Sequence, residues 1–444
     1  MRDILLTVIV FGFIPFIFIK PYIGVLVWTW LGFMSPHGMT FGFAQEMPFS
    51  KIIGVVTIIA FLMYKDKVIP KSSLILWLFL LYVFWSTVTT LFAIYPDEAL
   101  AQWGEFMKII VMMVITIFMT NNKERLHALL AVVAFSIAFY GFKGGIFTIQ
   151  TLGTLTVWGP LFSFMTDNNA LGLALVMTMP LLWYLHGHYQ SRWVKLFILL
   201  TMGLTALAIL GTQSRGAFLA LVSMSMFLVF KSKARFKAGI AVIILAPLLY
   251  QFMPQSWHER MDTIKNYEQD ESAMMRINAW EYTINLANDH PVTGGGYNAY
   301  TEELFTIYSE RPEIEWTGPH SIYFETLGDH GWIGLTIFLL MGLTLYRSMS
   351  YVMKHAKNYE DMHWARDLAA MIQVSTVGYA VAGAFLELAK FAPYYMLITM
   401  AVVIITLLKK RMAAEEEVVE VEDKYSKFKK GMKTSSSLGV SSPA

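Results

Sequence analysis

Two arginines and one histidine are the side chains in this sequence best suited to chemistry. Arg215 opens one apolar segment, His320 precedes another, and Arg276 lies in a polar stretch between them. A guanidinium binds phosphate oxygens through paired hydrogen bonds, and a histidine accepts a proton from a hydroxyl near neutral pH. If the protein is an enzyme, the simplest arrangement has both arginines neutralise a leaving pyrophosphate. His320 then deprotonates an acceptor hydroxyl, whose oxygen attacks an anomeric carbon from the opposite face with inversion.

Each of these residues also has an ordinary structural explanation. An arginine at the end of a membrane helix commonly extends its head group to the interface. Arg276 fits a weak surface ion pair, and a histidine before a helix commonly caps it. When Arg215 and His320 are considered singly, these structural explanations are favoured over a catalytic role.

Further polar and glycine residues accompany these three along the chain. Residues 167–169 open an apolar segment, where capping of the helix is favoured over a sugar or diphosphate contact. The glycine run 294–296 allows close backbone approach and is foremost a turn. Lys143 lies near the end of an apolar segment and fits either a phosphate contact or an interfacial position. The candidate substrate contacts are Lys143, Asp167, Asn168, Asn169, Gln213, Trp280, Gly295, Tyr297, Tyr323 and Glu325.

Signatures of a metal site are missing from the sequence. There is no cysteine, and Asp-x-Asp, P-loop and zinc-ligand patterns are also missing. We therefore expect no metal and no other cofactor, and a metal-dependent transferase that uses sugar nucleotides is disfavoured.

The elements that must position these residues are membrane helices. Hydrophobic residues make up 56% of the chain and charged residues 15%, against about 25% charged residues in soluble domains. The apolar residues form long blocks of the length that crosses a bilayer, without the alternation of a membrane β-barrel. The fold class is therefore all-α and polytopic, with about 12 membrane helices. The first two candidate spans are short and form a tight hairpin, two full spans or one broken span, which gives about 12 or 13 helices. The candidate spans are 3–19, 21–35, 50–64, 72–94, 103–120, 126–147, 168–186, 193–211, 214–230, 236–253, 331–353, 366–388 and 392–408.

The distribution of lysine and arginine predicts the orientation of these spans. Basic connections such as 65–71 alternate with connections such as 147–168, which contains no lysine or arginine. Basic loops favour the cytoplasm, so we expect a cytoplasmic C-terminus and a large folded connection on the other side. The net charge of +2 is close to neutral, and we expect no nucleic-acid partner. The predicted division is an N-terminal bundle, a loop subdomain with the catalytic residues, C-terminal membrane helices and a disordered tail, at 1–253, 254–330, 331–408 and 409–444.

The order of several motifs resembles a known superfamily. Ser-Arg-Gly at 214–216 is followed by Arg-x-x-x-Trp at 276–280 and Pro-x-x-Gly-x-Gly at 291–296. His-Ser-x-Tyr-x-Glu-x-x-Gly-x-x-Gly then begins at His320. Each motif is weak alone, but in this order they resemble the O-antigen ligase and O-antigen polymerase superfamily over nearly the whole chain. The stretches 139–145, 167–171 and 211–217 look closest to the O-antigen ligase or O-glycosylation ligase branch.

The resemblance implies a glycosyltransferase of GT-C type in the bacterial inner membrane. Such enzymes take a glycan from undecaprenyl diphosphate on the periplasmic side without a metal. The two phosphate-contacting arginines of the family correspond to Arg215 and Arg276, and its catalytic histidine to His320. Ser321 stands where many members have asparagine.

Several functions remain open at this point. The leading hypothesis is an O-antigen ligase with lipid A-core as acceptor. The alternatives are an O-antigen polymerase, a protein O-glycosylation ligase, and a transporter or flippase of lipid-linked glycans. In a transporter we expect charged or broken helices near the bilayer midplane. The candidate residues lie instead at a predicted membrane boundary, which favours an enzyme. We expect a monomer surrounded by membrane lipid.

Overall fold

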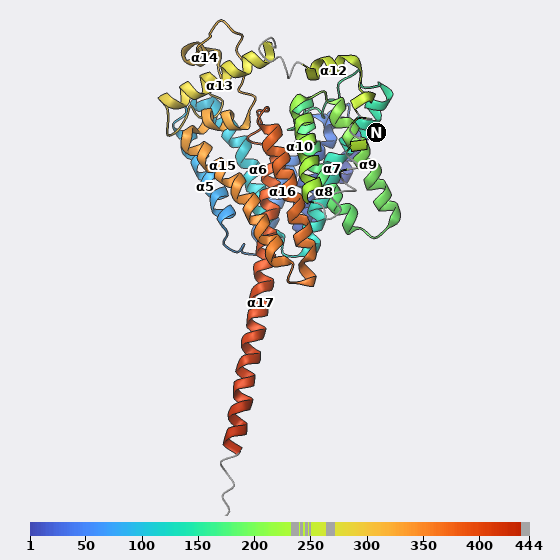
Figure 1. The fold of residues 1–444 in the computed structure, drawn as a ribbon, viewed down its shortest axis with the longest axis vertical. Coiled ribbons are helices and arrows are strands. Elements are labelled where there is room, and N and C mark those ends of the chain that lie inside the picture. The colour runs from blue at the N-terminus through green and yellow to red at the C-terminus, as the bar shows by residue number, and fades with distance from the viewer. Residues whose placement is uncertain (232–238, 240–242, 245–246, 248–249, 263–270, 437–444) are drawn as a thin grey trace, which may run out of the picture.

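The protein is an assembly of α-helices with a cap at one end. The computed structural model describes residues 1–231, 239, 243–244, 247, 250–262 and 271–436, and every regular element in these ranges is a helix (Figure 1). Eight helices in the described ranges are long and apolar enough to cross a membrane, and three shorter apolar helices accompany them. The prediction of an all-α polytopic membrane protein is confirmed, while the count of about 12 spans stays a prediction.

The helices of the N-terminal half follow the predicted apolar segments closely. They are α1 (Arg2–Gly12), α2 (Ile14–Ile19), α3 (Tyr22–Met34), η1 (Pro36–Met39), η2 (Phe43–Gln45), α4 (Phe49–Met63), α5 (Leu74–Leu91), α6 (Pro96–Met119), α7 (Lys123–Gln150), α8 (Asn168–His188), α9 (Arg192–Gly211) and α10 (Arg215–Lys231). The predicted span 236–253 lies mostly outside the described residues.

The C-terminal half consists of a polar cap followed by long helices. Its elements are α12 (Gln255–Asp262), α13 (Glu271–Asp289), α14 (Glu302–Tyr308), α15 (Ile322–Ala356), η4 (Glu360–Met362), α16 (His363–Gly383) and α17 (Ala392–Ser436). Figure 1 shows α12, α13 and α14 over one end of the bundle, while α17 extends beyond the other end. The described part of 254–330 thus contains α12, α13, α14 and the start of α15, with non-helical stretches at 291–301 and 309–321.

The core of the bundle lies around α8 and the first part of α17. The most apolar window of α8 is 78% buried, whereas that of the span Arg2–Ile19 is 17% buried. A helix that is apolar on all sides packs at the centre of a bundle, and α8 is such a helix. Its first residue, Asn168, is buried as well.

A sharp kink in α15 separates its polar start from its apolar remainder. Gly331 has φ 67° and ψ −173° inside the helix. This conformation is energetically unfavourable for any residue that has a Cβ atom. A Cβ on Gly331 would stand 2.7 Å from the carbonyl oxygen of Val292 and 2.9 Å from the amide nitrogen of Gly294. The amide of Gly295 donates to the Gly328 carbonyl at 2.8 Å. The predicted close backbone approach of the glycine run is confirmed, and its partner is the kinked part of α15.

The C-terminal tail differs from the sequence prediction. Disorder was expected from residue 409 onward, but α17 continues as a helix to Ser436. The segment is rich in alanine, glutamate and lysine, which favour helix, and Lys424 pairs with Glu420 one turn away at 2.8 Å. Residues 437–444 lie outside the described residues.

Candidate active site

His320 lies directly before α15 in a constrained backbone conformation. Its φ is 42°, a left-handed value that is uncommon for residues with a side chain and occurs at functional sites. The preceding carbonyl, of Pro319, accepts a hydrogen bond from the indole N–H of Trp280 at 2.7 Å. The Trp280 ring stacks on Phe324 with centroids 4.9 Å apart. Trp280, a candidate sugar contact, therefore joins α13 to both sides of His320.

Three charged groups act on the His320 ring. Burial lowers the pKa of His320, and the Arg276 guanidinium lowers this pKa further, while Asp167 and Glu325 act in the opposite direction. The imidazole is consequently neutral at pH 7 and able to accept a proton. The same interactions place Arg276 from α13 and Asp167 from the start of α8 near His320, although they are far apart in sequence.

The start of α8 is tied to the turn that carries Arg215. The Asp167 carboxylate accepts from the amides of Asn169 at 2.8 Å and Ala170 at 3.0 Å, so the predicted capping role is confirmed. The Asn168 amide group donates to the Thr212 carbonyl at 2.8 Å. Gln213 follows with φ 55°, and its side chain donates to the Gly153 carbonyl at 3.3 Å. Asn168 thus ties the α9–α10 turn to the start of α8, and Gln213 ties the same turn to the segment after α7.

Arg215 begins α10 beside the end of α16. A Cβ on the neighbouring Gly216 would stand 3.4 Å from the Cβ of Phe385 and 3.6 Å from the Ala382 carbonyl oxygen. The first turn of α10 therefore packs against the connection between α16 and α17. This connection also reaches the loop of His320.

Glu387 is a residue of this connection that the sequence analysis missed. Its carboxylate lies so close to Gly318 that a Cβ there would collide with it, and it accepts a hydrogen bond from the His320 backbone amide. Burial and the neighbouring Glu325 raise the pKa of Glu387 to about 7, while Lys390 and the His320 amide act against this rise. An acidic residue at the end of an apolar span is the signal that would have identified it.

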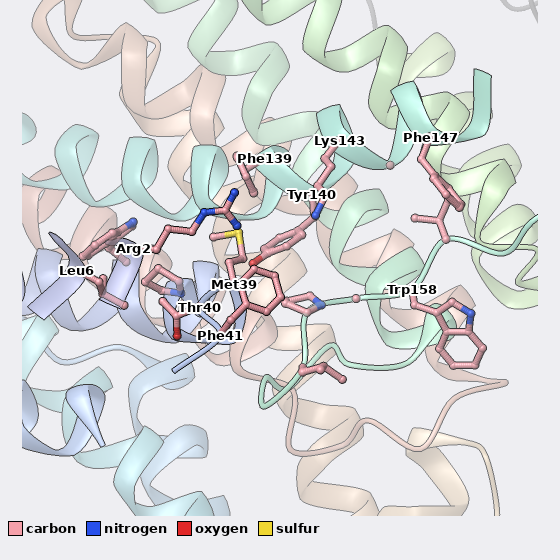
Figure 2. A pocket seen from close by; sticks show the side chains of 18 of the residues that line it. Arg2, Leu6, Met39, Thr40, Phe41, Phe139, Tyr140, Lys143, Phe147 and Trp158 are labelled. Carbon is pink, nitrogen blue, oxygen red and sulfur yellow. The ribbon is translucent and has the colours of Figure 1, made fainter. Parts of the chain in front are cut away.

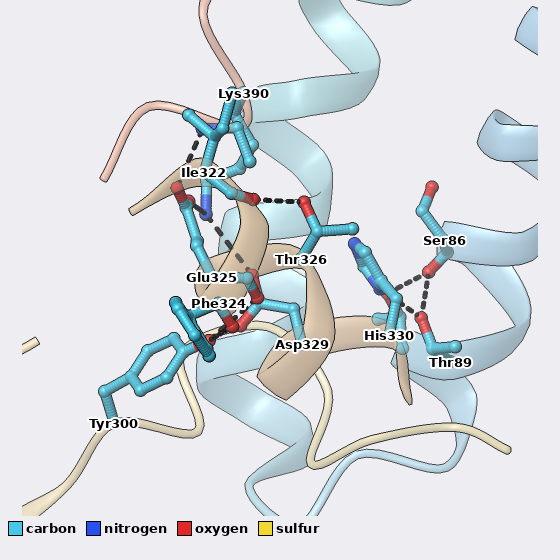
Figure 3. A network of polar contacts seen from close by, with 12 residues as sticks. Ser86, Thr89, Tyr300, Ile322, Phe324, Glu325, Thr326, Asp329, His330 and Lys390 are labelled. Carbon is cyan, nitrogen blue, oxygen red and sulfur yellow. Dashed lines mark hydrogen bonds and ion pairs between the residues drawn. The ribbon is translucent and has the colours of Figure 1, made fainter. Parts of the chain in front are cut away.

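A buried ion-pair network fixes the connection that carries Glu387 (Figure 3). The Lys390 ammonium lies 3.0 Å from one Glu325 oxygen and 3.7 Å from an Asp329 oxygen. The other Glu325 oxygen accepts from the Ala389 amide at 2.7 Å. Burial lowers the pKa of Lys390, but Glu325 and Asp329 outweigh burial, so this pKa is raised and the ammonium stays charged. Glu325, a candidate substrate contact, is instead 2% exposed and holds the 387–390 segment in place.

The remaining predicted contacts lie in other surroundings. Tyr297 is buried, with its ring 4.6 Å from the His330 ring and the Lys390 ammonium 4.9 Å from its centre. The Tyr323 hydroxyl donates to the Ala380 carbonyl at 2.8 Å and so joins α15 to α16. Lys143 lines a pocket between α1 and α7. Asp167 and Arg276 therefore act on His320, whereas Arg215 follows directly from the turn that Asn168 contacts, and its neighbour Gly216 packs on the α16–α17 connection that also reaches Gly318.

Two family models match parts of the chain. Residues 200–339 match the model of the O-antigen ligase family, and residues 1–190 match a family of unknown function (DUF5935). No curated protein matches the chain. The first match spans both arginines and His320. This match supports membership of the chain in the O-antigen ligase superfamily.

Proposed function

We propose that the protein is a metal-independent inverting glycosyltransferase of the O-antigen ligase type. It transfers a glycan from undecaprenyl diphosphate to a hydroxyl of lipid A-core on the periplasmic side of the inner membrane, with its C-terminus in the cytoplasm. The observation that carries this proposal is the electrostatic effect of Arg276 and Asp167 on a half-buried His320 that lies in a left-handed backbone conformation. The family match supports the donor class.

The proposed reaction assigns one task to each side chain. The His320 imidazole accepts the proton of the acceptor hydroxyl. The hydroxyl oxygen forms a bond to the anomeric carbon as the bond from that carbon to the diphosphate oxygen breaks. Arg215 and Arg276 stabilise the negative charge that develops on the diphosphate, which leaves with its lipid. Attack opposite to the leaving group inverts the anomeric configuration.

Positioning residues support this arrangement. The Trp280 indole donates to the Pro319 carbonyl, and the Glu387 carboxylate accepts from the His320 amide, so both polar groups of the peptide bond that precedes His320 have a hydrogen-bond partner. A fixed base costs less entropy in the transition state than a mobile one.

The acceptor is tested in a deletion strain by examining lipopolysaccharide and secreted glycoprotein side by side. The proposal predicts lipopolysaccharide without attached O-antigen, restored by the wild-type gene and not by His320→Ala. Intact lipopolysaccharide together with an unglycosylated protein assigns the chain to protein O-glycosylation. Shortened but attached O-antigen assigns it to polymerisation.

A further inference from the structure

A large pocket separates the first helix from the rest of the bundle. Its volume is about 840 Å³, at the upper end of the roughly 300–1,000 Å³ of small-molecule sites. Its walls come from α1, the η1 segment, α7 and residues 156–161. Figure 2 shows the side chains of Leu6 on α1 and of Phe139 and Tyr140 on α7 around this space.

Most of the side chains that line the pocket are apolar. Leu5 and Ile9 of α1 line the pocket and are 62% and 40% exposed. The span Arg2–Ile19 has a mean hydropathy of 2.2 and only 17% burial. Such a segment is stable in the bilayer only if its free faces meet hydrocarbon. The apolar part of the lining therefore favours an apolar occupant such as an acyl chain.

Two cations add a second requirement. Arg2 and Lys143 both line the pocket, from α1 and α7, and Figure 2 shows both side chains at it. Within the described ranges neither has a carboxylate at ion-pair distance, and the contact recorded for Arg2 is the Phe41 ring, 5.6 Å away. Exposed cations at a membrane boundary attract phosphate groups. An occupant with a hydrocarbon chain and a negative head group satisfies both requirements.

The walls of the pocket are built by close backbone contacts. A Cβ on Gly38 of η1 would stand 2.6 Å from the Leu161 carbonyl oxygen, so only glycine permits this approach. The Gly159 amide donates to the Thr166 carbonyl at 3.1 Å, and Phe162 has φ 58°. The Asp3 carboxylate accepts from the Ala44 amide at 3.2 Å, which fixes the start of α1 to η2. The pocket thus has a defined shape, and its boundaries include strained residues.

We propose that this pocket binds one anionic phospholipid of the surrounding membrane. Its phosphate lies between Arg2 and Lys143, and an acyl chain lies along Leu6 and Phe139. The lipid replaces protein contacts that α1 lacks and so holds this helix to α7. Lys143 accordingly binds a lipid phosphate and makes no contact with the glycan.

The test measures lipid binding by the purified full-length protein with native mass spectrometry. Delipidated protein is titrated with phosphatidylglycerol and, as a neutral comparison, with phosphatidylcholine of the same acyl chains. The test variants are Arg2→Gln, Lys143→Gln and the double variant. Lys51→Gln is the matched control, because Lys51 is an exposed cation in the first turn of α4 and has no carboxylate at ion-pair distance among the residues that the structure describes.

The proposal predicts one phosphatidylglycerol per protein, bound more tightly than phosphatidylcholine. Each lost cation weakens this binding about tenfold, and Lys51→Gln leaves it unchanged. Equal binding of both lipids, or equal weakening by Lys51→Gln, overturns the proposal. Displacement of phosphatidylglycerol by stoichiometric undecaprenyl phosphate also overturns it, because the pocket then belongs to the lipid-linked substrate.

Discussion

Removal of the Lys390 ammonium is expected to destabilise the protein strongly. Lys390→Met keeps most of the side-chain volume but leaves Glu325 and Asp329 without their cation. Both carboxylates have side chains 3% exposed, and the Lys390 side chain is 29% exposed. Loss of one partner of a buried pair costs about 3–5 kcal/mol. Because water reaches part of Lys390, we expect the lower end of this range, about 3 kcal/mol.

An exposed ion pair in the same protein provides the control. Lys108 lies near Glu105 on α6, with side chains 51% and 67% exposed. Lys108→Met should cost less than about 0.5 kcal/mol, because surface pairs contribute little. The comparison separates the effect of burial from the effect of replacing any lysine by methionine.

The measurement is unfolding of detergent-solubilised protein followed by the fluorescence of its 13 tryptophans. The double variant Lys390→Met/Glu325→Gln should recover part of the lost stability, because glutamine removes one unpaired charge and keeps an acceptor for the Ala389 amide. The reasoning is refuted if Lys390→Met is as mild as Lys108→Met. It is also refuted if Glu325→Gln adds a further independent loss, since coupled partners are not additive.

Three further predictions concern the site and the kink. Gly331→Ala should destabilise the fold by at least about 2 kcal/mol in thermal unfolding, because the φ of Gly331 is positive. The control is Gly342→Ala in the regular part of α15, where a Cβ would stand 3.6 Å from its nearest neighbour. This control should be neutral or slightly stabilising. The rate of glycan transfer should fall as pH drops through the lowered pKa of His320. Arg276→Gln should raise this pKa and so shift the acidic limb of the pH–rate profile to higher pH. An acidic limb that does not move contradicts the assigned effect of Arg276 on the His320 pKa. Glu387→Ala should slow transfer about tenfold through loss of a charge-assisted hydrogen bond, and Glu387→Gln, which keeps an acceptor for the His320 amide, should lose less. Equal rates for the two Glu387 variants contradict the positioning role.

The membrane helices were predictable because each apolar block is itself the signal. Blocks such as 168–186 and 193–211 nearly coincide with α8 and α9, since lipid and core both select apolar residues over the length of a span. The tail was not predictable by composition alone. Charge suggested disorder after residue 409, whereas helix propensity and pairs such as Glu420–Lys424 favour the continuation of α17.

The candidate site was predictable only in part. Arg276 and His320 were identified by type and motif, and the cap at Asp167 by position. Glu387 and Lys390 belong to the site because the α16–α17 connection packs against Gly318 and Glu325. These segments lie about 65 residues apart in sequence, so no local sequence pattern predicts the contact. Trp280 was predicted as a sugar contact, and the structure shows a hydrogen bond that shapes the His320 loop.

The most direct test of the account is a transfer assay with purified protein and an undecaprenyl diphosphate-linked glycan. His320→Ala is compared with His290→Ala, a half-exposed histidine in the same subdomain that neighbours Asp289. The account predicts that wild type and His290→Ala form product with inverted anomeric configuration and that His320→Ala forms almost none. Transfer by His320→Ala at the wild-type rate, or a product with retained configuration, contradicts it.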